Sequence, residues 1–113
     1  MKIYLMVYFV KDIKRSKAFF ENIGLTLTEE RHEHGPLHYS TTIGGTVFEI
    51  YPSGDGKPIS RTRIGLDFSE SAPLSDDALN FIKENSDSLH SMNGGKSYAV
   101  ITDPNENKVE LFW

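Results

Sequence analysis

Two stretches of the sequence decide the fold: Thr46-Val47-Phe48-Glu49-Ile50-Tyr51 and Lys108-Val109-Glu110-Leu111-Phe112-Trp113. Each is a strand-like run of apolar residues that contains one carboxylate, and the two carboxylates lie 61 positions apart. Because side chains alternate between the two faces of a strand, Glu49 points the same way as Tyr51, and Glu110 the same way as Phe112. A buried carboxylate without a partner is costly, so each must reach water, a cation or a strong hydrogen-bond donor.

The residues before these stretches repeat one order of elements in both halves of the chain. In the first half, strands are predicted over residues 3–10, 25–31, 37–42 and 46–51, and a helix over 13–22. In the second half, strands are predicted over residues 63–68, 88–91, 97–102 and 109–113, and a helix over 72–84. We therefore predict a single domain, residues 1–113, in which modules of about 1–52 and 62–113 are joined by a linker over 53–61.

Several local signals refine this prediction. Asp12 caps the first helix and Gly24 ends it, while Gly44-Gly45 and Gly94-Gly95 predict hairpin turns. The run over residues 3–10 is apolar on both faces, which predicts a buried central strand.

Composition excludes several classes of protein. The chain has 113 residues, of which 38% are hydrophobic and 25% charged, so it can bury one core and is too apolar to stay disordered. No run approaches the roughly 20 apolar residues of a membrane span, and we expect no signal peptide. A net charge of −4 argues against a nucleic-acid surface. The absence of cysteine excludes disulfides and thiolate nucleophiles and fits a cytoplasmic location.

Four segments make the chain resemble the vicinal oxygen chelate superfamily, which includes glyoxalase I, extradiol dioxygenases and the fosfomycin- and bleomycin-resistance proteins. These segments are Val10–Ile13, Phe19–Leu25, Phe48–Tyr51 and Asp103–Leu111. The resemblance implies an α+β fold in which two βαβββ modules form an open barrel-like cleft. One departure is Glu106, which stands in the last turn where the family commonly has glycine.

The resemblance also implies where a metal ion would lie. In metal-using members, side chains of the first and last strand of each module hold the ion, and the matching positions here are Leu5, Glu49, Arg63 and Glu110. Leucine has no ligand atom, and arginine is permanently protonated and has no acceptor. Since a divalent ion requires three or more protein ligands, we predict a metal-free pocket without a cofactor. The Arg63 guanidinium would partly neutralise both glutamates.

The histidines raise a second metal hypothesis. His32, His34 and His38 lie close together in the sequence, and imidazoles suit zinc or nickel. Gly35-Pro36 interrupts the strand before His38, so we interpret these histidines as exposed loop and strand residues. Either His38 or Tyr39 can line the cleft, and the strand register that decides between them stays open.

With these departures at Leu5 and Arg63, we favour a small-molecule-binding protein of the glyoxalase/bleomycin-resistance type, and whether the chain is also an enzyme stays open. It would sequester a hydrophobic or anionic ligand, without metal, in the intersubunit cleft of a cytoplasmic homodimer. The predicted ligand-binding residues are Leu5, His38, Glu49, Tyr51, Arg63, Glu110 and Phe112. Further aromatic residues proposed for the walls are Tyr4, Tyr8, Phe48 and Trp113.

Two alternatives stay open. One is a lyase, isomerase or dioxygenase that uses Glu49 and Glu110, with His38 or another histidine, to hold Ni²⁺, Zn²⁺, Mn²⁺ or Fe²⁺. The other is a degenerate structural relative in which Arg63 bridges both glutamates and fills the cleft. No serine nucleophile has the sequence context of a catalytic triad, and no catalytic residue is assigned.

Overall fold

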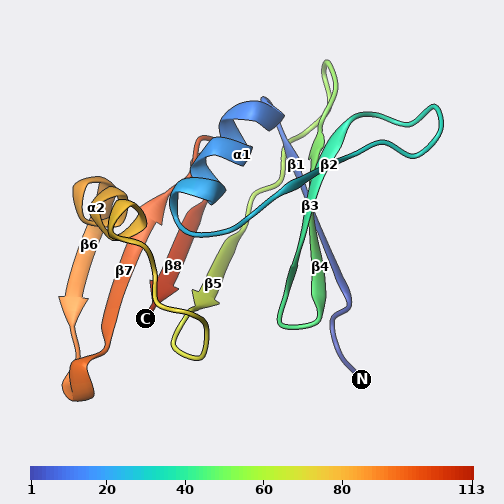
Figure 1. The fold of residues 1–113 in the computed structure, drawn as a ribbon. Helices are drawn as coiled ribbons and strands as arrows, with labels where there is room; N and C mark the ends of the chain where they lie inside the picture. Colours follow the sequence, from blue (N-terminus) through green and yellow to red (C-terminus); the bar gives the residue numbers. More distant parts are fainter. The chain divides into compact units, whose positions relative to one another are not determined.

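The computed structural model describes residues 1–113, which form two compact units. The first unit comprises residues 1–21 and 25–60, and the second comprises residues 22–24 and 61–113. The chain forms two four-stranded mixed sheets, and the element order β-α-β-β-β occurs twice, which confirms the predicted α+β fold of two βαβββ modules (Figure 1). Neither helix is long and apolar enough to cross a membrane.

The first sheet has the strand order β1-β4-β3-β2. Its elements are β1 (Leu5–Val10), α1 (Ile13–Asn22), β2 (Thr28–Glu30), β3 (His38–Ile43) and β4 (Thr46–Pro52). Strand β1 runs parallel to β4, and the other pairs are antiparallel. The predicted central position of β1 is wrong, because this strand lies at the edge of its sheet, with Leu5 and Phe9 40% and 45% exposed. The predicted cap of α1 is confirmed, since Asp12 Oδ1 accepts from the backbone N–H groups of Lys14 and Arg15.

Strand alternation gives the first sheet one core face and one helix-free face. On the core face, Tyr8 and Phe48 are at most 2% exposed, and both rings contact Phe20 of α1 edge to face, at centroid distances of 6.0 and 5.3 Å. Tyr8 and Phe48 therefore belong to the core, and their prediction as ligand walls is wrong. The alternate residues of β4, which include Glu49 and Tyr51, point to the opposite face.

The second sheet repeats this arrangement with the strand order β5-β8-β7-β6. Its elements are β5 (Arg63–Asp67), α2 (Asp76–Asn85), β6 (Ser86–Ser91), the 3₁₀ turn η1 (Asn93–Gly95), β7 (Ser97–Thr102) and β8 (Lys108–Phe112). Helix α2 begins four residues later than predicted because the hydroxyl of Ser75 caps it, accepting from the Ala78 N–H at 3.1 Å.

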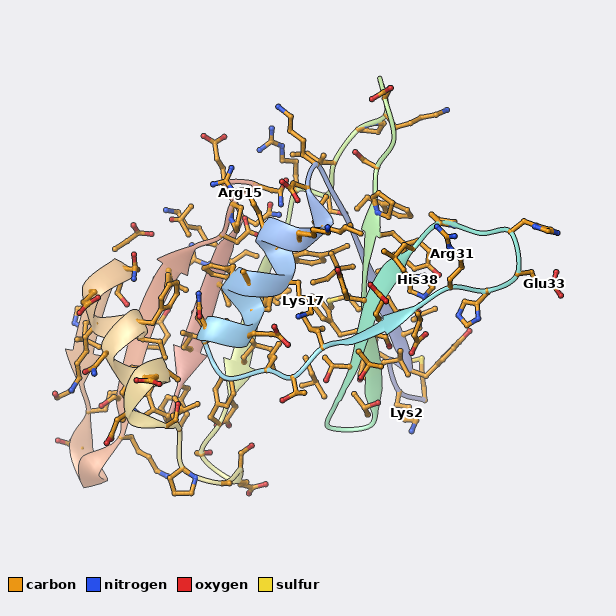
Figure 2. The ribbon with its side chains drawn as sticks, turned by 45° about the horizontal axis from the view of Figure 1, so that its top comes forward. Lys2, Arg15, Lys17, Arg31, Glu33 and His38 are labelled. Carbon is orange, nitrogen blue, oxygen red and sulfur yellow. The ribbon has the colours of Figure 1, made fainter.

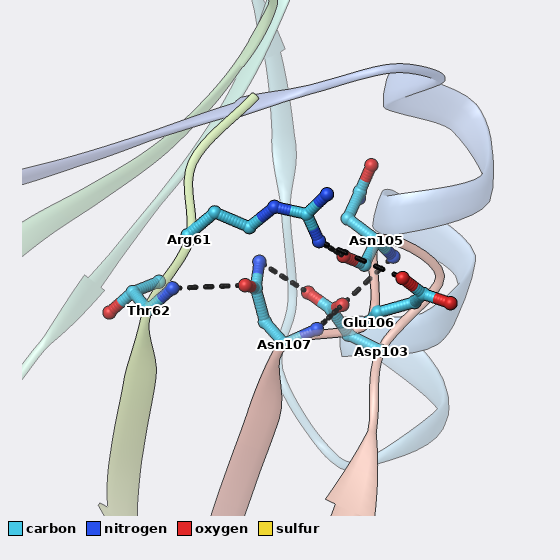
Figure 3. Close-up of polar contacts among 6 residues, drawn as sticks. All are labelled: Arg61, Thr62, Asp103, Asn105, Glu106 and Asn107. Atoms are coloured by element: carbon cyan, nitrogen blue, oxygen red, sulfur yellow. Dashed lines mark hydrogen bonds and ion pairs between the residues drawn. The ribbon is translucent and has the colours of Figure 1, made fainter. Parts of the chain in front are cut away.

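The turn between β7 and β8 is held by buried polar side chains (Figure 3). Asp103 is 4% exposed, and its Oδ1 accepts from the backbone N–H groups of Asn105 and Asn107 at 2.9 and 2.8 Å. The side-chain oxygen of Asn107 accepts from the Thr62 N–H at 2.9 Å, which ties the turn to the start of β5. Glu106 has a φ of 67°, a left-handed conformation that suits glycine, the residue that the resemblance leads us to expect here.

Replacing Asp103 with alanine should destabilise the protein strongly. The change leaves two buried N–H groups without an acceptor, so we expect a loss of about 2–4 kcal/mol in the free energy of unfolding. Urea denaturation measures this loss. Asp55→Ala, at an exposed loop position, is the matched control and should stay within about 0.5 kcal/mol of the wild type. Equal stability of the two variants would show that the turn does not depend on the Asp103 carboxylate.

Candidate functional site

In the second unit, Glu110 lies on the helix-free face of its sheet and has two side-chain partners. The Arg63 Nε–H donates to Glu110 Oε2 at 2.5 Å, and the Tyr98 hydroxyl donates to the other carboxylate oxygen. The strand register explains this grouping. Gly65 of β5 and Val100 of β7 lie directly opposite Glu110 on either side. Arg63 and Tyr98 are each two residues before these positions, so their side chains point to the same face as Glu110. The hydrogen bond from Tyr98, followed by that from Arg63, lowers the pKa of Glu110. The carboxylate is therefore ionised and neutralised by the guanidinium.

Beside this trio the same face is hollowed. The hollow measures about 230 Å³ and is lined by residues of β5, β7 and β8, namely Gly65, Leu66, Asp67, Tyr98, Glu110, Leu111 and Phe112. Two aromatic rings, those of Tyr98 and Phe112, offer apolar surface to a ligand. Gly65 adds no side chain, which keeps the hollow open between the carboxylates of Asp67 and Glu110.

In the first unit, Glu49 has a histidine as its neighbour. Its Oε2 lies 3.3 Å from His38 Nε2, and Glu30 Oε2 of β2 lies 3.4 Å from the same nitrogen. His38 is 1% exposed, and its ring stacks on Tyr51 at 4.1 Å with an interplanar angle of 10°. Burial, together with the nearby carboxylates of Glu49 and Glu30, raises the pKa of Tyr51.

A fourth side chain, His32, completes a cluster with Glu30, His38 and Glu49. One ligand atom from each of the four residues lies within 4.8 Å of the others. His32 follows β2 at the start of the loop to β3, and its side chain is 71% exposed. Figure 2 shows the setting, with Glu33 at the outer end of this loop and His38 next to the strands. This set of donors is chemically able to hold a transition metal.

The predicted site residues fall into both units. Leu5, His38, Glu49 and Tyr51 lie in the first, and Arg63, Glu110 and Phe112 lie in the second. The strand register places His38, and not Tyr39, on the same face as Glu49. Tyr39 points to the opposite face, where Lys17 Nζ of α1 lies 5.5 Å from the centre of the Tyr39 ring. The interpretation of the histidines as exposed is confirmed for His32 and His34 and wrong for His38.

Sequence reasoning missed two members of these groups, Glu30 and Tyr98. Both belong to strands whose register was not worked out. The hairpin turn that begins at Asp103 sets the pairing of β7 with β8, in which Val100 lies opposite Glu110. Tyr98, two residues before Val100, therefore shares the face of Glu110. Pairing β2 with β3 places Glu30 directly opposite His38.

Comparison with known proteins gives the chain a family. A model described as the Glyoxalase/Bleomycin resistance protein/Dioxygenase superfamily matches residues 2–111. No curated protein matches the sequence significantly.

Several solved structures share the fold at low sequence identity. An oxidase, ChaP-H2, is 20% identical with a TM-score of 0.68, over 99% of this chain and 92% of that one. Lactoylglutathione lyase from Agrobacterium tumefaciens is 14% identical with a TM-score of 0.64, over 98% and 92%. A glyoxalase/bleomycin resistance protein from Catenulispora acidiphila DSM 44928 is 14% identical with a TM-score of 0.63, over 98% and 97%. At these identities the similarity shows the fold alone.

The residues at the family's metal positions do not fit a divalent ion. Leu5 carries no ligand atom. Arg63 already bonds Glu110, and its fixed positive charge would repel an ion at that carboxylate. Glu49 and Glu110 alone supply fewer ligands than a bound ion requires.

Removing the Tyr98 hydroxyl should raise the pKa of Glu110. That hydroxyl is the largest cause of the lowered pKa, so Tyr98→Phe should move the carboxyl titration toward the ordinary value of a glutamate. The ionised Glu110 carboxylate stabilises the folded protein at pH values above the ordinary pKa of a glutamate, and this stabilisation is lost as the pH falls through the lowered pKa of Glu110. Because Tyr98→Phe raises that pKa, the variant should lose this stabilisation at a higher pH than the wild type. Carbon-13 NMR of the Glu110 carboxyl measures the shift. Tyr4→Phe, at an exposed position, is the control and should leave the titration unchanged.

Proposed function

The chain belongs to the glyoxalase/bleomycin resistance protein/dioxygenase superfamily, and we propose that it is a small-molecule-binding protein whose ligand binds near Arg63 with no metal ion at Glu110. The observation that carries this proposal is the ion pair between Arg63 and Glu110. A guanidinium occupies the charge environment that a divalent ion would need. Its partner Glu110 lines a hollow that also has the aromatic walls Tyr98 and Phe112.

The ligand that suits this hollow has an apolar body and an anionic or acceptor group. Tyr98 and Phe112 can pack against the apolar body. Arg63 uses its Nε–H for Glu110, and its side chain is 57% exposed, so the two terminal NH₂ groups can donate to a carboxylate of the ligand. The negative charges of Asp67 and Glu110 disfavour ligands with several anionic groups. A monocarboxylate with an aromatic or alicyclic body fits best.

We also propose that a second copy of the chain completes the cleft. Edge strand β1 and the residues before it expose large apolar side chains: Ile3, Tyr4, Leu5 and Phe9. Exposed apolar surface of this kind favours association, and the family resemblance supports a homodimer. The cysteine-free sequence is consistent with a reducing compartment such as the cytoplasm.

Replacing Arg63 with glutamine should abolish the binding of aromatic carboxylates. Wild-type protein, kept in a chelator, should gain several degrees in Tm with naphthoate, because a ligand at 100 times its Kd stabilises by about 2.7 kcal/mol. Arg63→Gln should show no such gain, whereas Arg31→Gln, at an exposed position in the first unit, should respond like the wild type. Thermal shift and calorimetric titration measure both effects.

Two results of the same experiment would decide against the proposal. If Arg63→Gln lowers Tm strongly without any ligand, Arg63 is a structural bridge and the chain is the degenerate relative. If naphthoate binds only after metal is added, the metal-dependent alternative is correct. A bulky side chain in the hollow, Gly65→Leu, gives an independent check, because it should block the apolar body of the ligand while leaving the Arg63–Glu110 pair intact.

The homodimer is tested through the exposed face of β1. Leu5→Lys places a charge among the apolar residues of that face, so it should shift the sedimentation coefficient from dimer to monomer. Lys2→Leu, nearby in sequence, serves as the control and should stay dimeric. A wild type that sediments as a monomer at all concentrations would contradict the proposed assembly.

A further inference from the structure

The first unit contains a buried histidine nitrogen that has no hydrogen-bond partner. The Nδ1 of His38 lies 3.1 Å from the Pro36 carbonyl oxygen. A carbonyl can only accept, so Nδ1 carries a proton, and in the neutral ring Nε2 is then the nitrogen that can bind a cation. His38 is 1% exposed, and Nε2 is buried without a hydrogen-bond partner. A buried polar atom of this kind requires an explanation.

This nitrogen lies close to two carboxylates. Glu49 Oε2 lies 3.3 Å from Nε2, and Glu30 Oε2 lies 3.4 Å from it. The Glu49 side chain is 14% exposed and that of Glu30 is 35% exposed, so water screens them only in part. Electron-rich atoms that converge in a buried place repel one another unless a cation lies among them.

Three of the six distances among these four ligand atoms match the ligand shell of a small cation, and all six are within 4.8 Å. A tetrahedral ion bound at about 2.0–2.1 Å holds its ligands about 3.3 Å apart. The three neighbouring pairs in the cluster are 3.3, 3.4 and 3.5 Å apart, the last of them between His32 Nε2 and Glu30 Oε2. Two imidazoles with two carboxylates suit Zn²⁺, Co²⁺ or Ni²⁺ better than Mg²⁺ or Ca²⁺, which prefer oxygen alone.

We propose that Glu30, His32, His38 and Glu49 bind one transition metal ion of the Zn²⁺ type. Glu49 is also one of the family's metal positions, whereas Glu30, His32 and His38 lie outside them, so this set of ligands differs from the family's. The proposed ion does not depend on the proposed ligand at Arg63. The surroundings support the ligands in the usual way: the Pro36 carbonyl fixes the His38 tautomer, and the stacked ring of Tyr51 fixes its orientation.

Four protein ligands close the shell of a tetrahedral ion, which is the pattern of a structural site. Two of the ligands, Glu30 and His32, flank Arg31 where β2 passes into the loop to β3, while His38 and Glu49 belong to the neighbouring strands β3 and β4. The ion therefore fastens the exposed loop to the helix-free face of the sheet. Arg31, labelled in Figure 2, is exposed beside His32 and reports on the state of the loop.

Titration with Co²⁺ tests the site directly. Full-length protein stripped with chelator should bind about one Co²⁺ per chain and develop the visible absorption of a tetrahedral ion, which Zn²⁺ then removes. His32→Gln should weaken binding by at least roughly tenfold, since losing even a supporting partner of a ligand commonly costs that much. His32 is exposed, so this variant should fold normally. His34→Gln, two residues away and exposed, is the matched control and should bind like the wild type.

Trypsin provides a second measurement. Zn²⁺ should slow cleavage after Arg31 in the wild type and in His34→Gln, but not in His32→Gln. A wild type that takes up no Co²⁺ would overturn the proposal. Binding that survives both His32→Gln and Glu30→Gln would also overturn it. Arg63→Gln should bind Co²⁺ normally, so failure of the ligand proposal and failure of this one can be told apart.

Discussion

The fold places one carboxylate of each final strand on a helix-free sheet face, and each carboxylate must find a positive or hydrogen-bonding partner there. Side-chain alternation fixes this constraint, because the residues on either side of Glu49 and Glu110 belong to the core. The two units meet it differently. Glu110 receives hydrogen bonds from Arg63 and Tyr98, whereas Glu49 lies 3.3 Å from a buried histidine nitrogen that has no hydrogen-bond partner. Two related positions in a repeated architecture thus carry different chemistry.

This difference separates the proposed ligand from the proposed metal. In the second unit the permanent cation Arg63 pairs with Glu110 and would repel a divalent ion, while the neighbouring hollow supplies aromatic surface. In the first unit, Glu49 of β4 lies in a cluster of potential metal ligands with His38 of β3. The other two members, Glu30 and His32, come from β2 and the loop after it. A fold that supports many chemistries does so through such local substitutions, so function has to be argued from the site.

The sequence predicts the repeated modules well because their signals are local. Asp12 caps α1, and the order of elements around Glu49 and Glu110 follows from apolar periodicity. Prediction from the sequence fails for features that depend on which strands pair with one another. The edge position of β1, the burial of His38 and the presence of Glu30 opposite it all depend on register. Alternation shows which residues share a face of one strand, but it does not show which strand lies next to it.

The central claim is that the charge of Arg63 keeps divalent ions away from Glu110 and that any bound ion sits instead at the histidine cluster of the first unit. Anomalous diffraction from crystals soaked in Zn²⁺ tests both parts together. The account predicts one anomalous peak among Glu30, His32, His38 and Glu49, and none within coordination distance of Glu110. A peak coordinated by Glu110, alone or together with Glu49, would contradict it.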